Sequence, residues 1–127
     1  MGIVHHGAYL LYFEAGRVEY MHRRGVQYLE WAERGLHLPV VEARVRYKKT
    51  ARFDERLIVD TRVAELRRVS VRFDYRILRE AGAEELVAEG HTLLACVGHD
   101  HAPKRIPEEV LDVLRSPETH PRPIDAA

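Results

Sequence analysis

Two adjacent histidines, His5 and His6, come just before a glycine, where an extended segment is expected to pass into a helix. An imidazole exchanges protons near neutral pH, so it can act as a general acid or base. The N–H groups at a helix N-terminus lack partners within the helix and lie at the positive end of its dipole. Such groups can bind an anion or stabilise an oxyanion. A surface histidine pair beside a helix cap would have the same sequence, so both interpretations stay open.

Other residues that could do chemistry give weaker signals. Glu14 lies on the predicted helix, where its carboxylate could orient a histidine or pair with Arg17. No serine is placed as a nucleophile, and Cys96 lies in an apolar run, where a thiol is normally inert. We therefore do not expect covalent catalysis by serine or cysteine.

Two histidine groups could suggest a metal site. The pair at 5–6 and the segment His99-Asp100-His101 each bring imidazoles close together. Neither group has third and fourth ligands at a recognisable spacing. We expect solvated loop histidines and no metal.

Basic residues cluster at the ends of predicted strands, in residues 47–52, 67–68 and 104–105. Arginine and lysine at such places could hold the phosphates of a nucleotide-bearing substrate. Solvated strand ends explain any single cluster equally well.

The elements that would position these groups follow from hydrophobic periodicity. Tyr9, Phe13, Gly16 and Tyr20 recur at helical spacing, which predicts a helix that stops near Gly25. The small residue at position 16 would let another element approach closely. A second, short helix is predicted over residues 26–34, ending at a C-terminal glycine.

The period then changes to two. Alternating apolar and polar residues predict strands over 41–47, 57–63 and 69–77, and a less regular run predicts another over 86–97. A turn at 80–83 would join the last two as a hairpin, and residues 107–114 could form a last helix. One helix followed by a meander of antiparallel strands is an α+β pattern, and the sheet is expected to wrap around the long N-terminal helix.

Length and composition limit the possible functions. The 127 residues suit a single domain at 1–115, followed by a flexible tail at 116–127 that contains three prolines. Twenty basic and twenty acidic side chains argue against nucleic acid as a partner. No apolar run is long enough to insert across a membrane. One cysteine favours a cytoplasmic protein, and the absence of asparagine with many arginines suits a thermophile.

Four segments resemble one known family. Residues 2–20 look like the helix-entry motif of the 4-hydroxybenzoyl-CoA thioesterase-like hotdog proteins, a group that includes the thioesterases associated with the Tol–Pal cluster. Tyr47 with residues 50–54 is similar to the loop between the family's first long strands. Residues 90–97 and 105–107 resemble its closing strand and exit. The likeness extends to about Leu114, and the helix-entry motif is its most specific part.

The resemblance implies a hotdog fold, a homodimer or homotetramer, and hydrolysis of an acyl-CoA substrate without a metal or other cofactor. In the family an aspartate before the helix acts as nucleophile or base, and the helix N-terminal amide polarises the thioester carbonyl. His6 matches the position of that amide and of a common histidine that positions water or substrate. The candidate catalytic residues are His6, Gly7 and Glu14, and the candidate substrate-binding residues are His5, Tyr9, Phe13, Lys49, Thr50, Arg52 and Arg68.

The sequence departs from the family at its start. The family's aspartate lies seven residues before the position of His6, which falls upstream of Met1, together with the first strand. We therefore expect the chain as given to be slow or inactive. Two other functions compete: a non-catalytic module that binds acyl-CoA or an acyl carrier, and a hotdog hydratase or dehydratase. Binding without thiol release would indicate the first, and hydration of an enoyl-CoA the second.

Overall fold

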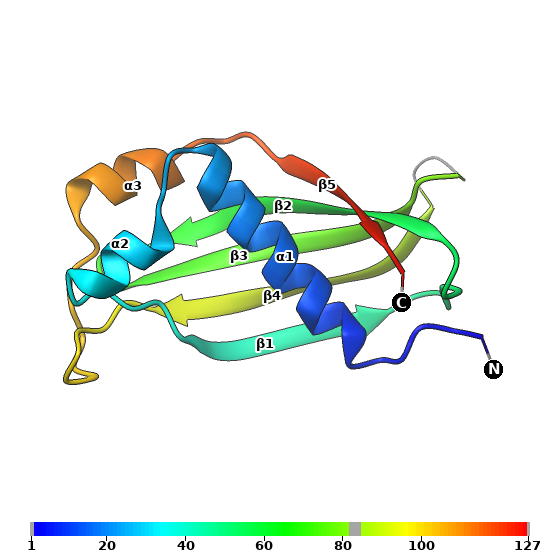
Figure 1. Cartoon of the computed structure of the whole chain (residues 1–127), viewed down its shortest axis with the longest axis horizontal. Helices are drawn as coiled ribbons and strands as arrows, with labels where there is room; N and C mark the ends of the chain where they lie inside the picture. The colour runs from blue at the N-terminus through cyan, green and yellow to red at the C-terminus, as the bar shows by residue number, and fades with distance from the viewer. Residues whose placement is uncertain (1, 82–84, 127) are drawn as a thin grey trace.

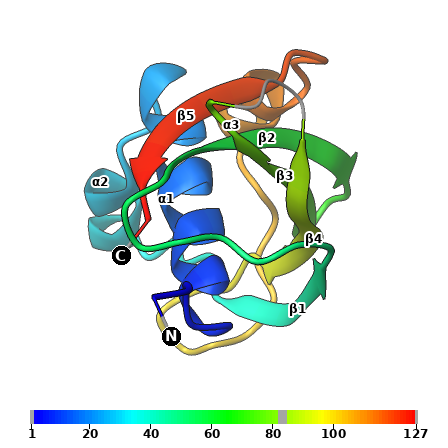
Figure 2. The same ribbon diagram turned by 90° about the vertical axis from the view of Figure 1, so that its right-hand side faces the viewer.

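The long helix α1 (Ala8–Arg23) lies across one face of a curved antiparallel sheet (Figure 1). The computed structural model of the chain describes residues 2–81 and 85–126. Turned by 90°, the sheet is seen to wrap around α1 (Figure 2). The strands run in the order β1-β4-β3-β2-β5, where β1 is Val40–Tyr47, β2 Arg56–Leu66, β3 Ser70–Arg79, β4 Leu86–Ala95 and β5 His120–Asp125. The predicted α+β hotdog architecture is confirmed.

The two short helices also lie close to their predicted places. They are α2 (Tyr28–Glu33) and α3 (Glu108–Leu114), and Pro107 occupies the N-cap of the second. Gly25 and Gly35 follow α1 and α2 with φ of 80°, a backbone conformation that favours glycine at a helix end. None of the helices in the described residues is both long and apolar enough to cross a bilayer.

The core lies between α1 and the inner face of the sheet. Phe13 stacks on Tyr75 of β3 with ring centroids 4.4 Å apart, and Tyr20 meets Phe73 edge-on. A Cβ atom on Gly16 would lie 2.5 Å from Oγ1 of Thr61 on β2, closer than real atoms approach. The absence of a side chain at position 16 therefore lets α1 sit against β2, as the helical spacing predicted.

The first strand alternates as predicted, but of its apolar residues only Val45 packs partly against the core. β1 is an edge strand, and Val41 and Tyr47 remain 59% and 51% exposed. Periodicity identifies the face of a strand that can be buried, and the position of the strand in the sheet decides whether it is.

The prediction of a loose tail is wrong for residues 120–125. These residues form β5, which pairs antiparallel with β2 over Arg56–Thr61. Ile124 packs partly against the core, and Ala126 is buried. The strand alternates prolines with other residues, and proline is tolerated in a sheet only at an edge, so the usual strand signal is missing. The predicted turn at 80–83 lies partly outside the described residues.

Candidate active site

The N-terminus of α1 is organised by its two histidines. The N–H of Gly7 donates to Nδ1 of His5 at 3.0 Å, and the N–H of Ala8 donates to the His5 carbonyl at 3.0 Å. Because Nδ1 accepts, the proton of a neutral His5 ring lies on Nε2. The His5 and His6 rings have centroids 4.0 Å apart. Within the described part of the chain, no hydrogen bond uses the His6 N–H, so that amide is available to a ligand.

Two segments that the sequence singled out separately meet at this helix start. The N–H of Val4 donates to the Ala51 carbonyl at 2.7 Å, and the N–H of Phe53 donates to the Gly2 carbonyl at 3.2 Å. The hydroxyl of Tyr47 donates to the His6 carbonyl at 2.9 Å. Main-chain pairing therefore holds the segment before α1 against the loop after β1.

A hollow of about 660 Å³ opens where these segments meet. Five of the predicted site residues line it together: His5, His6, Tyr9, Lys49 and Thr50. Ile3, Val4, Tyr47, Lys48 and Phe53 complete its wall. The hollow thus combines the predicted oxyanion amide with aromatic and basic side chains, and we refer to it as the helix-start hollow.

The described lining of the helix-start hollow contains two lysines and no acidic side chain. Lys49 pairs with Glu85 at 3.1 Å, and Lys48 lies 3.7 Å from Glu89. Burial, helped by the nearby Tyr12, raises the pKa of Tyr9, so its hydroxyl remains protonated at neutral pH. No carboxylate belongs to the described lining of this hollow. A reaction that needs a carboxylate there must receive it from elsewhere.

Five predicted residues do not line the helix-start hollow. Gly7 is the N-cap of α1, and its N–H is taken up by the His5 ring. Phe13 is fully buried in the core, and Arg52 lines a neighbouring polar hollow with Thr50. Glu14 borders a second hollow along α1. Arg68 lies in the turn between β2 and β3, at the opposite end of β2 from the helix-start hollow.

Sequence reasoning missed Arg79, which holds the loop after β1 that lines the hollow. Arg79, at the end of β3, donates to the Thr50 carbonyl at 2.6 Å and forms an ion pair with Glu55. Its side chain is only 19% exposed. The sequence carried no signal for this role beyond a basic residue at a strand end, because the contact joins positions far apart in the chain.

A second hollow, of about 420 Å³, lies between α1 and α2. Its wall is mainly apolar and includes Val18, Met21 and Leu29, with Glu14 and Arg17 at its rim. Leu29 is 79% exposed. Among the described residues, no three His, Cys, Asp or Glu side chains are grouped so that they could hold a metal ion.

Comparison with known proteins gives one consistent result. The family model of the thioesterase-like superfamily matches residues 1–114. A putative esterase of Aquifex aeolicus is 34% identical over 90% of this chain and 86% of its own length. The hypothetical protein TT1821 of Thermus thermophilus is 40% identical with a TM-score of 0.82, covering 90% of this chain and 85% of that one. A DHNA-CoA thioesterase of Staphylococcus aureus is 33% identical with a TM-score of 0.80, covering 88% and 74%.

Proposed function

Because this chain belongs to the thioesterase-like superfamily, we propose that it hydrolyses acyl-CoA thioesters in the helix-start hollow. The observation that carries this proposal is the free N–H of His6, which borders a hollow large enough for the reacting part of a thioester. The finer resemblance, to the 4-hydroxybenzoyl-CoA type, remains part of the proposal, as does a cytoplasmic location.

In the proposed reaction, water attacks the thioester carbonyl carbon and the C–S bond then breaks. The His6 N–H hydrogen-bonds to the carbonyl oxygen as it becomes negative, and the adjacent helix dipole favours that charge. The departing CoA sulfur takes up a proton, and the acyl group leaves as the acid. The His6 ring positions the attacking water, and the aromatic wall at Tyr9 and Tyr47 suits a short or flat acyl group.

The reaction also needs a general base, and the described lining of the hollow does not supply a carboxylate for that role. Glu14 lies outside this lining, five residues, about one and a half helical turns, beyond Tyr9. We propose that a carboxylate outside this described lining acts as the base.

We further propose that the chain works as a homodimer or homotetramer. Exposed apolar side chains occur on α1 at Leu11 and Val18 and on the edge strand at Val40 and Val41. Exposed apolar side chains on a helix and on an edge strand are available for contact with a second chain. Association would bring a second chain close to both hollows.

The absence of a carboxylate from the described lining of the hollow also favours a second candidate function. A module that binds acyl-CoA without cleaving it needs the pocket, the free amide and the lysines, but no base. Such a module and a slow thioesterase share the same binding site and differ only in turnover.

Release of CoA thiol from acetyl-, medium-chain and aromatic acyl-CoAs separates the two. The measurement uses the 127-residue chain and a version lengthened at its N-terminus by a strand that places an aspartate seven residues before His6. Cys96 is buried and burial raises its pKa, so its own thiol contributes little background. Turnover that appears or rises strongly in the lengthened version supports the thioesterase. Acyl-CoA binding without turnover in either version supports the module, and neither binding nor turnover contradicts both.

A matched pair of histidine variants tests the assigned ring. His6→Asn keeps the backbone amide and should reduce turnover by about 10- to 100-fold if the ring positions water. His101→Asn changes an exposed histidine outside the lining, at a positive φ that asparagine tolerates, and should leave turnover unchanged. Equal losses in both variants would remove His6 from the mechanism.

A further inference from the structure

The face of the sheet turned away from α1 carries a regular grid of charged side chains. Side chains alternate between the two faces of a strand, and neighbours in register lie side by side. One row runs Arg44, His91, Asp74, Arg62 across β1, β4, β3 and β2. The next row runs Arg46, Glu89, Arg76, Asp60 across β1, β4, β3 and β2. We call this surface the outer grid.

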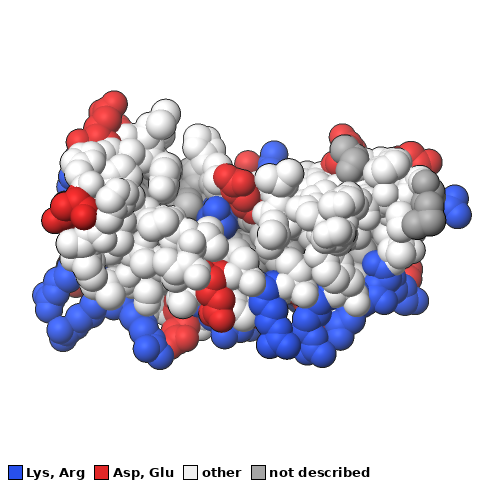
Figure 3. Space-filling model, turned by 90° about the horizontal axis from the view of Figure 1, so that it is seen from below, with Lys and Arg blue, Asp and Glu red and all other residues white. Residues whose placement is uncertain are grey.

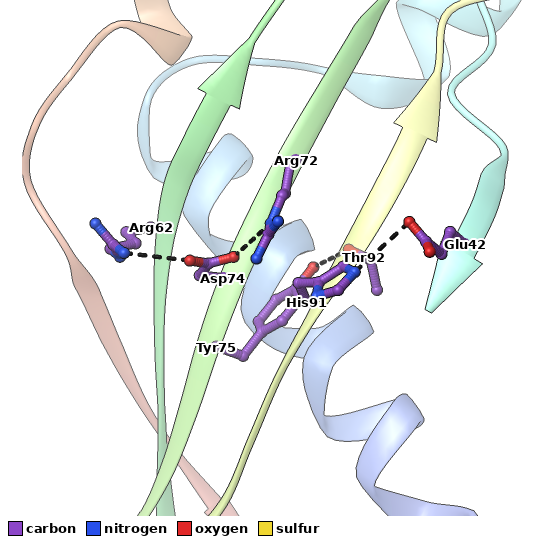
Figure 4. A network of polar contacts seen from close by, with 7 residues as sticks. All are labelled: Glu42, Arg62, Arg72, Asp74, Tyr75, His91 and Thr92. Carbon is purple, nitrogen blue, oxygen red and sulfur yellow. Dashed lines mark hydrogen bonds and ion pairs between the residues drawn. The ribbon is translucent and has the colours of Figure 1, made fainter. Parts of the chain in front are cut away.

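Two acidic residues of the outer grid, Asp74 and Glu89, are already engaged. Asp74 accepts from Arg62 at 3.2 Å and from Arg72 at 2.9 Å (Figure 4). Glu89 lies 3.7 Å from Lys48 rather than against Arg46 or Arg76. On the inner face, the hydroxyls of Tyr75 and Thr92 are hydrogen-bonded to each other at 2.6 Å. They add no charge to the outer grid. The carboxylates therefore neutralise the grid only in part.

Three arginines of the outer grid have no partner among the residues that the structure describes. Arg44, Arg46 and Arg76 are exposed, and none of them forms a hydrogen bond or ion pair with a residue that the structure describes. They border a hollow of about 280 Å³ with Arg62, Arg72 and the residues between them. Basic side chains gather along one margin of the molecule, the lower margin in Figure 3. Five arginines and two carboxylates line this hollow, so its net charge is positive.

The spacing of the three arginines indicates the size of the anion that they could share. Arg44 and Arg46 are two residues apart on β1, about 7 Å along the strand, and Arg76 lies two strands away, about 10 Å across the sheet. With their backbones this far apart, the three arginines are too widely spaced to share one small anion without extending their side chains toward it. Long arginine side chains can converge on a ligand that extends a few ångströms, and their planar donor groups match phosphate oxygens.

From this arrangement we propose that the outer grid binds an anion with at least two phosphoryl groups, at a site separate from the helix-start hollow. A second copy of the same face is a poorer occupant. It would bring unpaired arginines toward each other and remove them from water, which is unfavourable for like charges without a counter-ion. The proposal does not rest on thioester hydrolysis.

Calorimetric titration of the full chain with inorganic pyrophosphate tests this site. We expect saturable one-to-one binding that weakens as salt rises, and tighter binding of pyrophosphate than of sulfate. The double variant Arg46→Gln with Arg76→Gln should bind at least about tenfold more weakly, because two charge-assisted contacts are lost. Its thermal unfolding should be unchanged, since neither arginine has a partner to lose.

The matched control removes the same charge elsewhere. Arg34→Gln with Arg115→Gln changes two exposed arginines on or beside α2 and α3 and should alter pyrophosphate binding less than about twofold. Equal losses in both double variants would mean diffuse attraction and would overturn the proposal, as would undetectable binding or equal affinity for sulfate. If free CoA competes with pyrophosphate, the natural ligand is a diphosphate carried by a nucleotide. If free CoA does not compete, the ligand is a free diphosphate. Turnover plays no part in the readout, so failure here is distinct from failure as a thioesterase.

Discussion

The hydroxyl of Tyr47 donates a 2.9 Å hydrogen bond to the carbonyl oxygen of His6. This contact ties the end of β1 to His6, two residues before α1 begins, across 41 positions of sequence. It fixes the carbonyl on one side of the His6 residue while the N–H on the other side stays free. The strand end therefore helps to set the direction in which that amide points.

Tyr47→Phe should remove this link while keeping the aromatic wall. We expect a loss of about 0.5–1.5 kcal/mol in the free energy of unfolding, typical of one hydrogen bond, together with weaker acyl-CoA binding. Tyr28→Phe is the matched control, because the Tyr28 hydroxyl also bonds to the backbone, accepting from Leu38 N–H at 3.3 Å away from the helix-start hollow. Denaturant unfolding and acyl-CoA titration check the two parts separately. Equal effects on binding in both variants would contradict a specific role for Tyr47.

Gly16→Ala should destabilise the protein although alanine is the better helix former. The new Cβ would lie 2.5 Å from Thr61 Oγ1 and just over 3 Å from Val59, so α1 or β2 must shift, at a cost of about 1–3 kcal/mol. Adding Thr61→Ala should recover much of that loss, since it removes the closest atom. A double-mutant cycle of denaturant midpoints measures the coupling. Additive effects would show that the two positions do not touch.

The ion pair between Glu55 and Arg79 should make stability depend on pH in the acid range. The Arg79 hydrogen bond, followed by the Arg52 N–H, holds the pKa of Glu55 below its usual 4.5. A carboxyl with a depressed folded-state pKa stabilises the fold above its unfolded pKa, and this contribution is lost as pH falls through the folded-state value. Glu55→Gln should therefore be less stable than the parent at pH 6, with the difference shrinking below about pH 4.

Thermal unfolding at several pH values measures this difference. Glu109→Gln provides the control, because the pair between Arg34 and Glu109 is more than half exposed on both sides and should contribute little at any pH. A gap between Glu55→Gln and the parent that stays constant from pH 6 to pH 3 would mean that the carboxylate charge is not what holds the loop.

Deletion of residues 116–127 should weaken the protein by removing β5. The edge of β2 would lose its pairing over Arg56–Thr61, and the cover provided by Ile124 and Ala126 would be lost. We expect a loss of about 2 kcal/mol or more, and self-association through the uncovered strand. Asp125→Asn, which alters only an exposed side chain of β5, should behave like the parent. Unchanged unfolding and a monodisperse sample after deletion would contradict a structural role for β5.

Local pattern was sufficient for most of the architecture. The helical spacing from Tyr9 to Tyr20 and the alternation in four strands predicted α1 and β1 to β4, because both signals come from neighbouring residues that share one face. The same reasoning failed at β5, where Pro121 and Pro123 remove the usual strand signal. That segment is a strand only because the β2 edge lies beside it.

The site divides in the same way. The sequence by itself determined that histidines would stand at a helix N-terminus and that Lys49 and Thr50 would follow a strand, since each statement needs only a short segment. The tertiary structure alone decided that these segments meet, that Phe13 belongs to the core, and that Glu14 and Arg68 lie elsewhere. It also decided that Arg79 holds the loop and that three arginines of the outer grid stay unpaired. Distances between residues remote in sequence depend on strand order and register, which hydrophobic periodicity does not encode.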